Sequence, residues 1–303
     1  SFQGTCPGTS YALYLIDSPA SLTAAARILL ELRQKDSCAT DDAQIDGRHI
    51  VALDAEGVPE ELLLLQLCTS EGCFVFDCVS LTAVLVCIKL RELFAPEAPI
   101  CWLVHDLHQD ASCLYRYGLH FHCCIDTQLL AERIEGEHSI GFQHMLRKVS
   151  GGSMTHANKE AIHSKLKAEG VGMFKRRPMA EAVLHYAAQD VGLLFYAFLK
   201  HSKTAFCDST NDVREILAAS RSRAHYAAHN AGQRRVSFDA AQGYKICSHE
   251  LLLETSSRQD VVRDKKKLRL SDEGAVVEDD ITALTNILPQ RLQEALCSDQ
   301  GGR

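Results

Sequence analysis

The 303-residue chain is predicted to be an α/β protein with a mixed central sheet flanked by helices. Apolar, strand-like runs alternate along the sequence with helix-like segments, which is the order of elements in α/β folds. Two of the runs, 62–68 and 73–76, are separated only by Thr69-Ser70-Glu71-Gly72, a turn that favours an antiparallel hairpin. Because this pair is antiparallel and the other strands are joined by helices, the sheet is expected to be mixed.

Each element follows from its own stretch of sequence. Further strands are expected at four apolar runs, 11–16, 49–53, 100–104 and 121–125. Helices are expected where apolar residues recur every three or four positions, at 21–33, 80–94, 106–117, 126–134, 140–149, 156–169, 178–200 and 211–230. Pro178 is expected to be the first residue of its helix, because the N–H that proline lacks is not needed there.

A change of character near residue 205 divides the chain into two predicted parts. Residues 11–205 contain the regular alternation of strands and helices and form one predicted domain. Residues 206–303 form a predicted, mostly helical C-terminal extension, with a final helix at 277–295. No repeat or motif indicates what this extension does, and its length makes it a candidate surface for a protein partner.

Composition and charge limit the possible ligands. With 46% hydrophobic and 23% charged residues, the chain resembles globular rather than disordered proteins. Its formal net charge of −7 argues against a general attraction to nucleic acid, so an anionic ligand is expected to need a local basic surface or a bound metal. No apolar run reaches the length of a membrane span, about eighteen residues, and no membrane partner is predicted.

The thirteen cysteines indicate the redox environment. They form no paired C-x-x-C knuckles, which argues against a structural zinc site. Several lie inside apolar runs, where a reduced cysteine packs as a small hydrophobic residue. An intracellular, reducing compartment is therefore expected, with cytoplasm, nucleus and organelle all left open.

Four carboxylates and a tyrosine lie in three short motifs. Asp54 and Glu56 end an apolar run and share one face of the expected strand, because strand side chains alternate. Asp110 lies on the helix that follows a later strand, and Tyr186 stands one helical turn before Asp190. Buried carboxylates need cationic compensation, and Mg²⁺ and Mn²⁺ prefer oxygen ligands. The four carboxylates are therefore predicted to bind two divalent cations against a phosphodiester, with Tyr186 orienting the attacking water.

This ordered set resembles the DEDDy branch of 3′–5′ exonucleases, which contains ribonuclease D, the Werner-type exonuclease domain and the Rrp6-like nucleases. The resemblance covers about residues 11–200. It points in particular to the exonuclease 3′–5′ domain-containing protein 1 and Egalitarian subgroup. Four segments carry it, namely Asp54-Ala55-Glu56-Gly57-Val58, Val104-His105-Asp106 with Asp110 and Leu114, Asp126-Thr127-Gln128, and Arg177-Pro178 followed by Tyr186-Ala187-Ala188-Gln189-Asp190-Val191.

The resemblance implies a fold and a reaction. The fold is an RNase H-like, DnaQ-like exonuclease sheet with its active site at the edge of the central strand. The reaction releases nucleoside monophosphates from free 3′ ends of single-stranded nucleic acid, RNA rather than DNA. One departure follows Val58, where Pro59-Glu60-Glu61 replaces a longer and often basic loop of the subgroup.

Candidate nucleic-acid contacts lie beside the motifs and in a basic region. They are Gly57, Val58, His105, Lys175, Arg176 and Arg177. Between 141 and 177, eight lysines and arginines face two glutamates, an excess suited to phosphate contact in an otherwise acidic protein. His105 either supports the site or forms hydrogen bonds at the strand end. Asp126 is expected to cap the helix that starts at Thr127.

Two other hypotheses compete with an active enzyme. Some members of the subgroup have lost catalytic carboxylates and act as RNA-binding adaptors, and residues 206–303 would suit an adaptor or a subunit of a larger complex. All five positions are intact here, which favours catalysis. A purely structural α/β protein, with carboxylates that merely cap helices, would need a separate explanation for each of the five residues.

Overall fold

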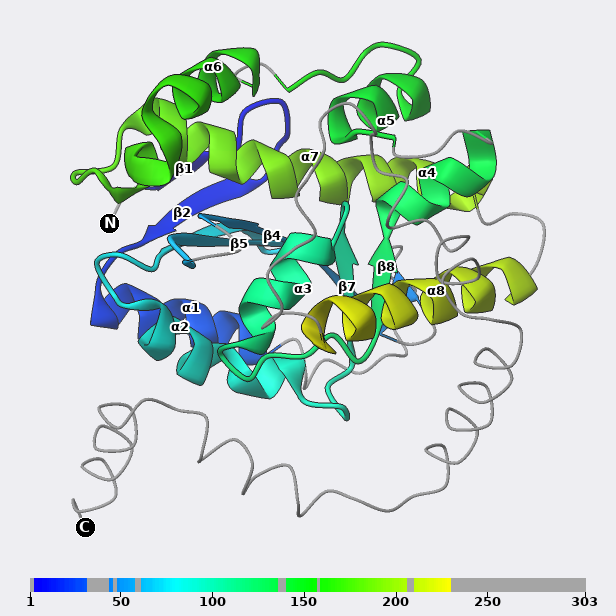
Figure 1. The fold of residues 1–303 in the computed structure, drawn as a ribbon, viewed down its shortest axis with the longest axis horizontal. Helices are drawn as coiled ribbons and strands as arrows, with labels where there is room; N and C mark the ends of the chain where they lie inside the picture. Colours follow the sequence, from blue (N-terminus) through cyan, green and yellow to red (C-terminus); the bar gives the residue numbers. More distant parts are fainter. Residues whose placement is uncertain are drawn as a thin grey trace. The chain divides into compact units, whose positions relative to one another are not determined.

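A computed structural model describes most of the first 229 residues. The described ranges are 3–31, 44–45, 48–57, 61–135, 140–156, 159–205 and 210–229. The predicted helix at 277–295 and the candidate contact Val58 lie outside them. The structure confirms the expected mixed sheet flanked by helices (Figure 1).

Within the described ranges, eight strands form the sheet. They are β1 (Gln3–Thr5), β2 (Ala12–Ile16), β3 (Gln44–Ile45), β4 (Arg48–Glu56), β5 (Leu64–Thr69), β6 (Gly72–Asp77), β7 (Ile100–Val104) and β8 (Cys124–Asp126). Their order across the sheet is β1-β2-β6-β5-β4-β7-β8, with β3 paired to β4. Strands β5 and β6 form the predicted antiparallel hairpin, whereas β4, β7 and β8 run parallel.

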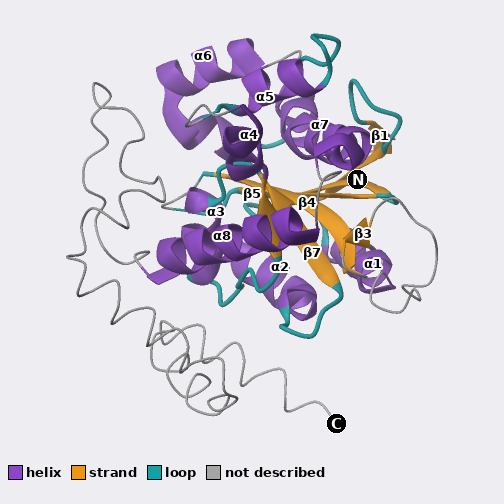
Figure 2. Ribbon diagram, turned by 90° about the vertical axis from the view of Figure 1, so that its right-hand side faces the viewer, coloured by secondary structure: helices purple, strands orange, loops and turns teal. Residues whose placement is uncertain are grey.

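Helices cover both faces of the sheet (Figures 1 and 2). They are α1 (Pro19–Glu31), α2 (Ala83–Leu90), α3 (His108–Tyr115), α4 (Thr127–Glu135), α5 (Phe142–Val149), α6 (Lys159–Glu169), α7 (Glu181–Ala205) and α8 (Thr210–His229), with 3₁₀ turns η1 (Arg91–Phe94) and η2 (Gly170–Lys175). One apolar core lies beneath α4–α7, and a second lies against α1, α2 and α3. The sheet is therefore the middle layer of three.

The position of β4 between these two cores determines where its side chains point. Ala52 belongs to the core beneath α7, whereas Leu53 and Ala55 belong to the core on the opposite face. Because side chains alternate along a strand, Asp54 and Glu56 point to the same side as Ala52, toward α7. The strand thus presents two carboxylates to the sheet-facing side of α7.

Helix α7 begins later than the sequence predicts. Its first residue is Glu181, not Pro178, and the carbonyl of Ala180 accepts the first helical hydrogen bonds. Arg177 is bound instead to Asp77 at the end of β6, which keeps the segment before Glu181 outside the helix. The Arg177–Pro178 peptide bond is cis.

The apolar surface of α7 is used for packing. Its Glu181–Leu199 portion is long and apolar enough to cross a membrane, but 78% of that portion is buried inside the protein. Helix α7 contacts β4, β5 and β6. It is therefore the core helix of this face, and it places Tyr186 and Asp190 over the end of β4.

Helix α8 lies beyond the predicted boundary at residue 205, yet it packs against α3 and β8. It belongs to the same compact unit as the sheet, Ser1–Arg234. The described part of the C-terminal region thus contacts α3, which carries Asp110, and the strand β8.

Candidate active site

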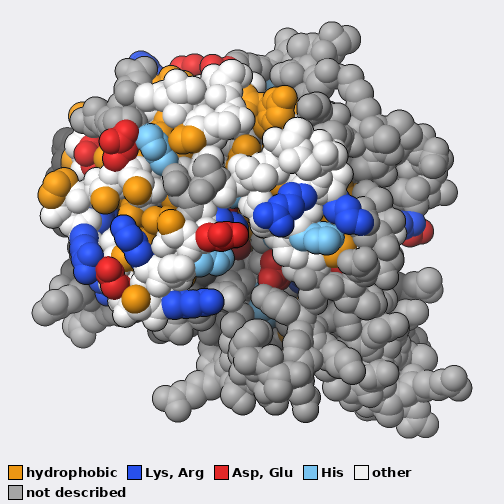
Figure 3. Space-filling model, turned by 90° about the horizontal axis from the view of Figure 1, so that it is seen from above, with side chains coloured by type: hydrophobic (Ala, Val, Ile, Leu, Met, Phe, Trp, Pro, Cys, Tyr) orange, Lys and Arg blue, Asp and Glu red, His pale blue; other side chains and the backbone are white. Residues whose placement is uncertain are grey.

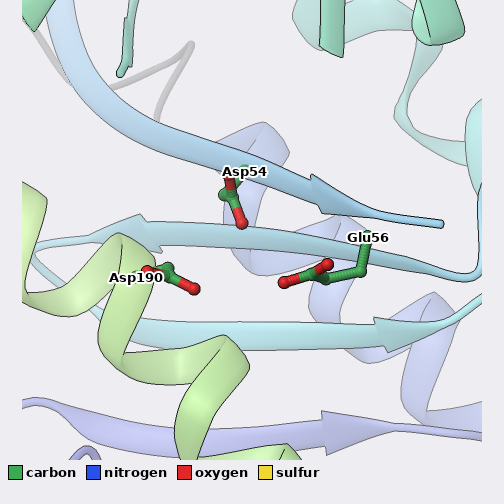
Figure 4. Close-up of side chains that lie close together, drawn as sticks. All are labelled: Asp54, Glu56 and Asp190. Carbon is green, nitrogen blue, oxygen red and sulfur yellow. The ribbon is translucent and has the colours of Figure 1, made fainter. Parts of the chain in front are cut away.

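Three of the predicted carboxylates converge at the end of β4. Asp54 and Glu56 come from this strand and Asp190 comes from α7, and the three side chains point toward one another (Figure 4). One carboxylate oxygen from each lies within 4.8 Å of those of the other two. Such a group of hard oxygen donors suits a divalent cation.

Asp110 completes the acidic pocket from α3. It is buried on the first turn of that helix. Its charge acts on Glu56, and both Asp110 and Asp54 are stabilised by the backbone N–H of Ala55. The structure therefore brings all four predicted carboxylates into one pocket, with Asp54, Glu56 and Asp190 as the closest group of three.

Three of the four carboxyl groups, Asp54, Glu56 and Asp110, have raised pKa values. Burial, followed by the charge of Asp190, raises the pKa of Asp54 to about 8. Burial and the neighbouring carboxylates also raise the pKa of Glu56 and of Asp110 well above the ordinary range. Like charges placed close together in a poorly solvated site favour protons or cations. A bound divalent cation would relieve this repulsion.

Tyr186 lies buried one turn before Asp190 on α7. Burial, the negative charge of Asp190 and the hydrogen bond between the two side chains raise the pKa of Tyr186 far above the ordinary phenol value. The hydroxyl group is therefore protonated at physiological pH. In this state the phenol can orient a water molecule but cannot act as a base.

Lys159 provides a positive charge that sequence reasoning assigned only to the general basic region. Its Nζ lies 3.2 Å from Asp190 Oδ1 and 4.9 Å from the centre of the Phe142 ring. Its charge opposes the rise in the pKa of Asp54 and Glu56. One ammonium group cannot balance four carboxylates, so the pocket retains a demand for further cations.

Two further buried polar side chains near the carboxylates, His156 and Gln66, were not predicted from the sequence. The ring nitrogens of His156 have no hydrogen-bond partner among the described residues, although Nε2 lies 3.5 Å from Asp190 Oδ1. The side-chain amide of Gln66 is likewise unpaired there, and Gln66 stands opposite Asp54 in the β4–β5 ladder. Buried polar groups normally have partners. Water around a bound cation would supply them, so these residues fit a metal site.

The first-motif and second-motif candidates have structural roles. Gly57 has a φ of +92°, and an added Cβ would lie 2.5 Å from the Leu63 side chain, so only glycine fits here. His105 forms hydrogen bonds with Thr127 Oγ1 and the Ile140 carbonyl, each 3.0 Å long. This is the strand-end role, one of its two alternatives. Burial lowers the pKa of His105 to about 4, so the ring is neutral.

The three basic candidates each pair with a carboxylate. Lys175 pairs with Glu61 and Arg176 with Glu169 in exposed ion pairs, whereas Arg177 binds the buried carboxylate of Asp77. Basic side chains are spread over the face that carries α5 and α6, with acidic ones between them (Figure 3). Nucleic-acid contact by these residues stays a prediction.

The fold and the pocket together define a class of protein. A mixed sheet whose central strand presents two carboxylates to a helix carrying Tyr186 and Asp190 is an RNase H-like exonuclease arrangement. The sequence profile of the 3′–5′ exonuclease family matches residues 26–203, which is more than half of the chain and includes all five predicted site residues. The chain therefore belongs to the 3′–5′ exonuclease family.

Solved structures show the same fold. RNase D from Trypanosoma brucei is 19% identical with a TM-score of 0.57, over 71% of this chain and 72% of that one. Escherichia coli RNase D is 19% identical with a TM-score of 0.53, over 71% and 50%. The catalytic core of T. brucei RRP6 is 18% identical with a TM-score of 0.52, over 73% and 52%. A comparison with curated proteins gives no significant match.

Proposed function

We propose that this protein is a metal-dependent exonuclease that releases nucleoside monophosphates from the 3′ ends of single-stranded RNA. The observation that carries the proposal is the convergence of Asp54, Glu56 and Asp190, with Asp110 beside them, in a member of the 3′–5′ exonuclease family. The preference for RNA is supported by the similarity to RNase D, which in T. brucei has a structure in complex with RNA U12. It is also supported by the resemblance to the exonuclease 3′–5′ domain-containing protein 1 and Egalitarian subgroup.

The four carboxylates would hold two Mg²⁺ or Mn²⁺ ions. Bound divalent cations supply Lewis acidity at the phosphate and lower the pKa of a bound water. The oxygen donors, the raised carboxyl pKa values and the unpaired amide of Gln66 all support this assignment. Asp54 interacts electrostatically with both Asp110 and Asp190, so it would belong to the ligand set together with both of them.

The remaining residues would orient the reactants and stabilise charge. The phenol of Tyr186 donates its hydrogen bond to Asp190, and its oxygen would accept a hydrogen bond from the attacking water and so orient it toward the phosphodiester. The ammonium group of Lys159 would place positive charge near the phosphate oxygens once cations neutralise the carboxylates. The proton released by the attacking water would pass to solvent.

The function can be tested with labelled oligonucleotides. Single-stranded RNA and DNA of one sequence, labelled at either end, are incubated with protein and Mn²⁺, with and without chelator. We expect RNA to shorten from its 3′ end, and chelator to stop the reaction. Asp54→Ala and Asp190→Ala should each lower the rate by about a hundredfold or more while the circular dichroism spectrum stays that of the wild type.

The outcome also separates the alternative function. Tight, chelator-independent RNA binding without cleavage would support an RNA-binding adaptor or complex subunit, with a protein partner bound through residues 206–303. Full activity in either carboxylate variant would overturn the ligand assignment. Preferential shortening of DNA would overturn the proposed substrate class.

The proposed setting is an intracellular, reducing compartment. The nine cysteines of the described ranges carry free thiols, and most of them are buried in the apolar cores. Cys68 and Cys73 face each other across the β5–β6 hairpin with their sulfur atoms 3.1 Å apart and unbonded. Reduced thiols in such contact suit a compartment that does not oxidise them.

A further inference from the structure

Helix α8 makes a buried contact with the end of β8. Ser220 Oγ accepts a hydrogen bond from the backbone N–H of Asp126, with an N–O distance of 2.8 Å. Arg223 Nη1 donates to Asp126 Oδ2 at 2.7 Å and to Gln128 Oε1 at 3.0 Å. The side chains of Asp126 and Arg223 are 0% and 9% exposed, so this ion pair is almost fully removed from solvent.

The Asp126 carboxylate in turn holds the loop between β7 and α3. Its Oδ1 accepts the backbone N–H of Asp106 at 2.9 Å, and its Oδ2 accepts that of Leu107 at 3.3 Å. Asp106 has a φ of +56°, in the left-handed region that aspartate tolerates better than most non-glycine residues, and its N–H is fixed in this conformation by the Asp126 carboxylate. Oδ1 also accepts the N–H of Gln128 at 2.9 Å, which confirms the expected cap of α4.

Helix α3 starts immediately after this loop and carries Asp110 in its first turn. The loop conformation therefore sets the direction of the helix and the distance of Asp110 from Asp54. Helix α8 also contacts α3 directly, because Ser112 Oγ donates to the Ala227 carbonyl at 2.9 Å. Helix α8 is thus connected to the loop before α3 through Asp126, and to α3 itself through Ser112.

We propose that α8 is a positioning element for the active site, in which Arg223 and Ser220 fix Asp126 and Asp126 fixes the loop that sets Asp110 for cation binding. This inference rests on the proposed function of the carboxylate pocket. A buried ion pair adds little net stability over apolar residues, but it defines a geometry, and removing one partner leaves the other charge uncompensated. Mutation of groups that orient metal ligands without touching the metal commonly weakens metal binding by roughly 10- to 100-fold.

The experiment uses the full chain with three variants. Arg223→Met removes the cation, Arg223→Lys keeps a charge without the planar guanidinium, and Arg221→Met changes an exposed arginine of the same helix as a control. Mn²⁺ binding is followed by electron paramagnetic resonance of the free ion, which requires no activity. Hydrogen exchange is followed in the peptide containing Asp106 and Leu107, and kcat and KM are measured on RNA.

We expect Arg223→Met to weaken Mn²⁺ binding about tenfold and to speed amide exchange at the loop. At limiting Mn²⁺, kcat should fall in proportion while KM for RNA stays within about twofold, because the RNA-facing side chains are unchanged. Arg223→Lys should recover part of both effects, and Arg221→Met should match the wild type. A folded Arg223→Met variant with wild-type Mn²⁺ affinity and loop exchange would overturn the inference.

A second variant covers the case in which Arg223→Met does not fold. Ser220→Ala removes the hydrogen bond to the Asp126 backbone without leaving a buried charge, and it should shift Mn²⁺ affinity and loop exchange in the same direction by a smaller factor. Wild-type values in both Ser220→Ala and Arg223→Lys would overturn the inference. An inactive wild type that binds Mn²⁺ would overturn the proposed function instead, and the binding and exchange data would still decide the role of α8.

Discussion

Lys159 is a basic residue of this chain that contacts the acidic pocket directly. Its ammonium group contacts Asp190 and lies over the Phe142 ring, in a site where four carboxylates repel one another. Without metal, this group supplies part of the compensation that buried carboxylates require. Divalent cations would neutralise the same charges, so the contribution of Lys159 to stability should depend on whether metal is bound.

Replacement of Lys159 by methionine tests this dependence. We expect Lys159→Met to lower the Tm of the metal-free protein and to have a smaller effect in saturating Mn²⁺, so the rise in Tm caused by Mn²⁺ becomes larger than in the wild type. Thermal unfolding with and without Mn²⁺ measures both values. Lys165→Met, at an exposed position of the same helix, is the control and should leave the Mn²⁺ effect unchanged. An equal loss of Tm with and without metal would contradict this role.

The site residues divide into those that the sequence shows and those that only packing reveals. Asp54, Glu56, Tyr186 and Asp190 follow from spacing, because strand alternation and the helical turn place each pair on one face. Gln66, His156 and Lys159 belong to no pair of this kind. They reach the carboxylates because β5 pairs with β4 and α6 packs against α7, contacts that local periodicity does not encode.

Arg177 shows how an element boundary is fixed by a side chain. Its guanidinium group binds both carboxylate oxygens of Asp77, which also accepts the N–H groups of Val79 and Ser80. Although burial acts in the opposite direction, these hydrogen bonds hold the pKa of Asp77 below its ordinary value. The pair ties the segment before α7 to the end of β6 and so limits where Tyr186 and Asp190 lie.

Loss of this pair should affect stability more than RNA binding. We expect Arg177→Met to lower the free energy of unfolding by about 3–5 kcal/mol, because Asp77 would remain buried without its main partner. Arg176→Met removes an exposed pair with Glu169 and should cost less than about 1 kcal/mol. Urea unfolding measures both. An Arg177→Met protein of wild-type stability that binds RNA more weakly would instead support the nucleic-acid contact predicted from the sequence.

The close approach of α7 to the sheet depends on Gly192. A Cβ added at this position would lie 2.5 Å from Cys6 Sγ and 3.1 Å from Cys73 Sγ, both in the core beneath the helix. Glycine is otherwise unfavourable inside a helix by about 1 kcal/mol relative to alanine. Its use here indicates that close packing outweighs helix propensity.

A double-mutant cycle tests the steric contact. Gly192→Ala should destabilise the protein by about 1–3 kcal/mol through overpacking, despite the better helix propensity of alanine. Cys6→Ala removes the sulfur that the new methyl group would meet, so the double variant should be more stable than the sum of the single changes predicts, by at least about 1 kcal/mol. Additive free energies of unfolding would show that the two residues do not compete for the same space.

At the scale of elements, apolar runs predicted β2, β4, β5, β6 and β7, and helical periodicity predicted the helices. Strand β8 was expected at 121–125 and lies at Cys124–Asp126, and the short strands β1 and β3 were not predicted. The start of α7 was wrong by three residues, since the Arg177–Asp77 contact joins segments far apart in the chain. The packing of α8 against α3 and β8 also depends on contacts between segments far apart in the chain. Its apolar periodicity predicted the helix but not the elements against which it packs.

For the whole molecule, the order of strands and helices predicted the three-layer α/β fold, and the resemblance supplied its RNase H-like topology. Neither the order of elements nor the resemblance indicates how burial changes the pKa values of the site carboxyl groups. The raised pKa values of Asp54, Glu56 and Asp110 require a site that solvent reaches poorly and that gathers charges from β4, α3 and α7. This property belongs to the assembled fold and links its stability to pH and metal.

The sign of that linkage is fixed by the direction of the shifts. Between its ordinary value and about 8, the Asp54 carboxyl in the folded protein binds a proton that the unfolded chain has lost, so rising pH favours unfolding. Buried His105, with its pKa lowered to about 4, acts in the opposite direction, but only below about pH 7, above which histidine is neutral in both states. From pH 7 to 8 the buried thiols of Cys78 and Cys87, whose pKa values burial raises, act in the same direction as the carboxyl groups, so the carboxyl contribution is the part of the slope that an Asp54 variant removes.

We expect the metal-free protein to lose stability from pH 7 to 8, with a slope of up to about 1.4 kcal/mol per pH unit for each proton released. Mn²⁺ replaces these protons, so the stabilisation by Mn²⁺ should grow over the same interval. Thermal or urea unfolding at several pH values, with and without Mn²⁺, measures both trends. Asp54→Asn cannot ionise and should make the metal-free slope less steep by the share that Asp54 contributes. A metal-free stability that rises from pH 7 to 8 would mean that the carboxylates are already compensated and that the pocket does not require divalent cations.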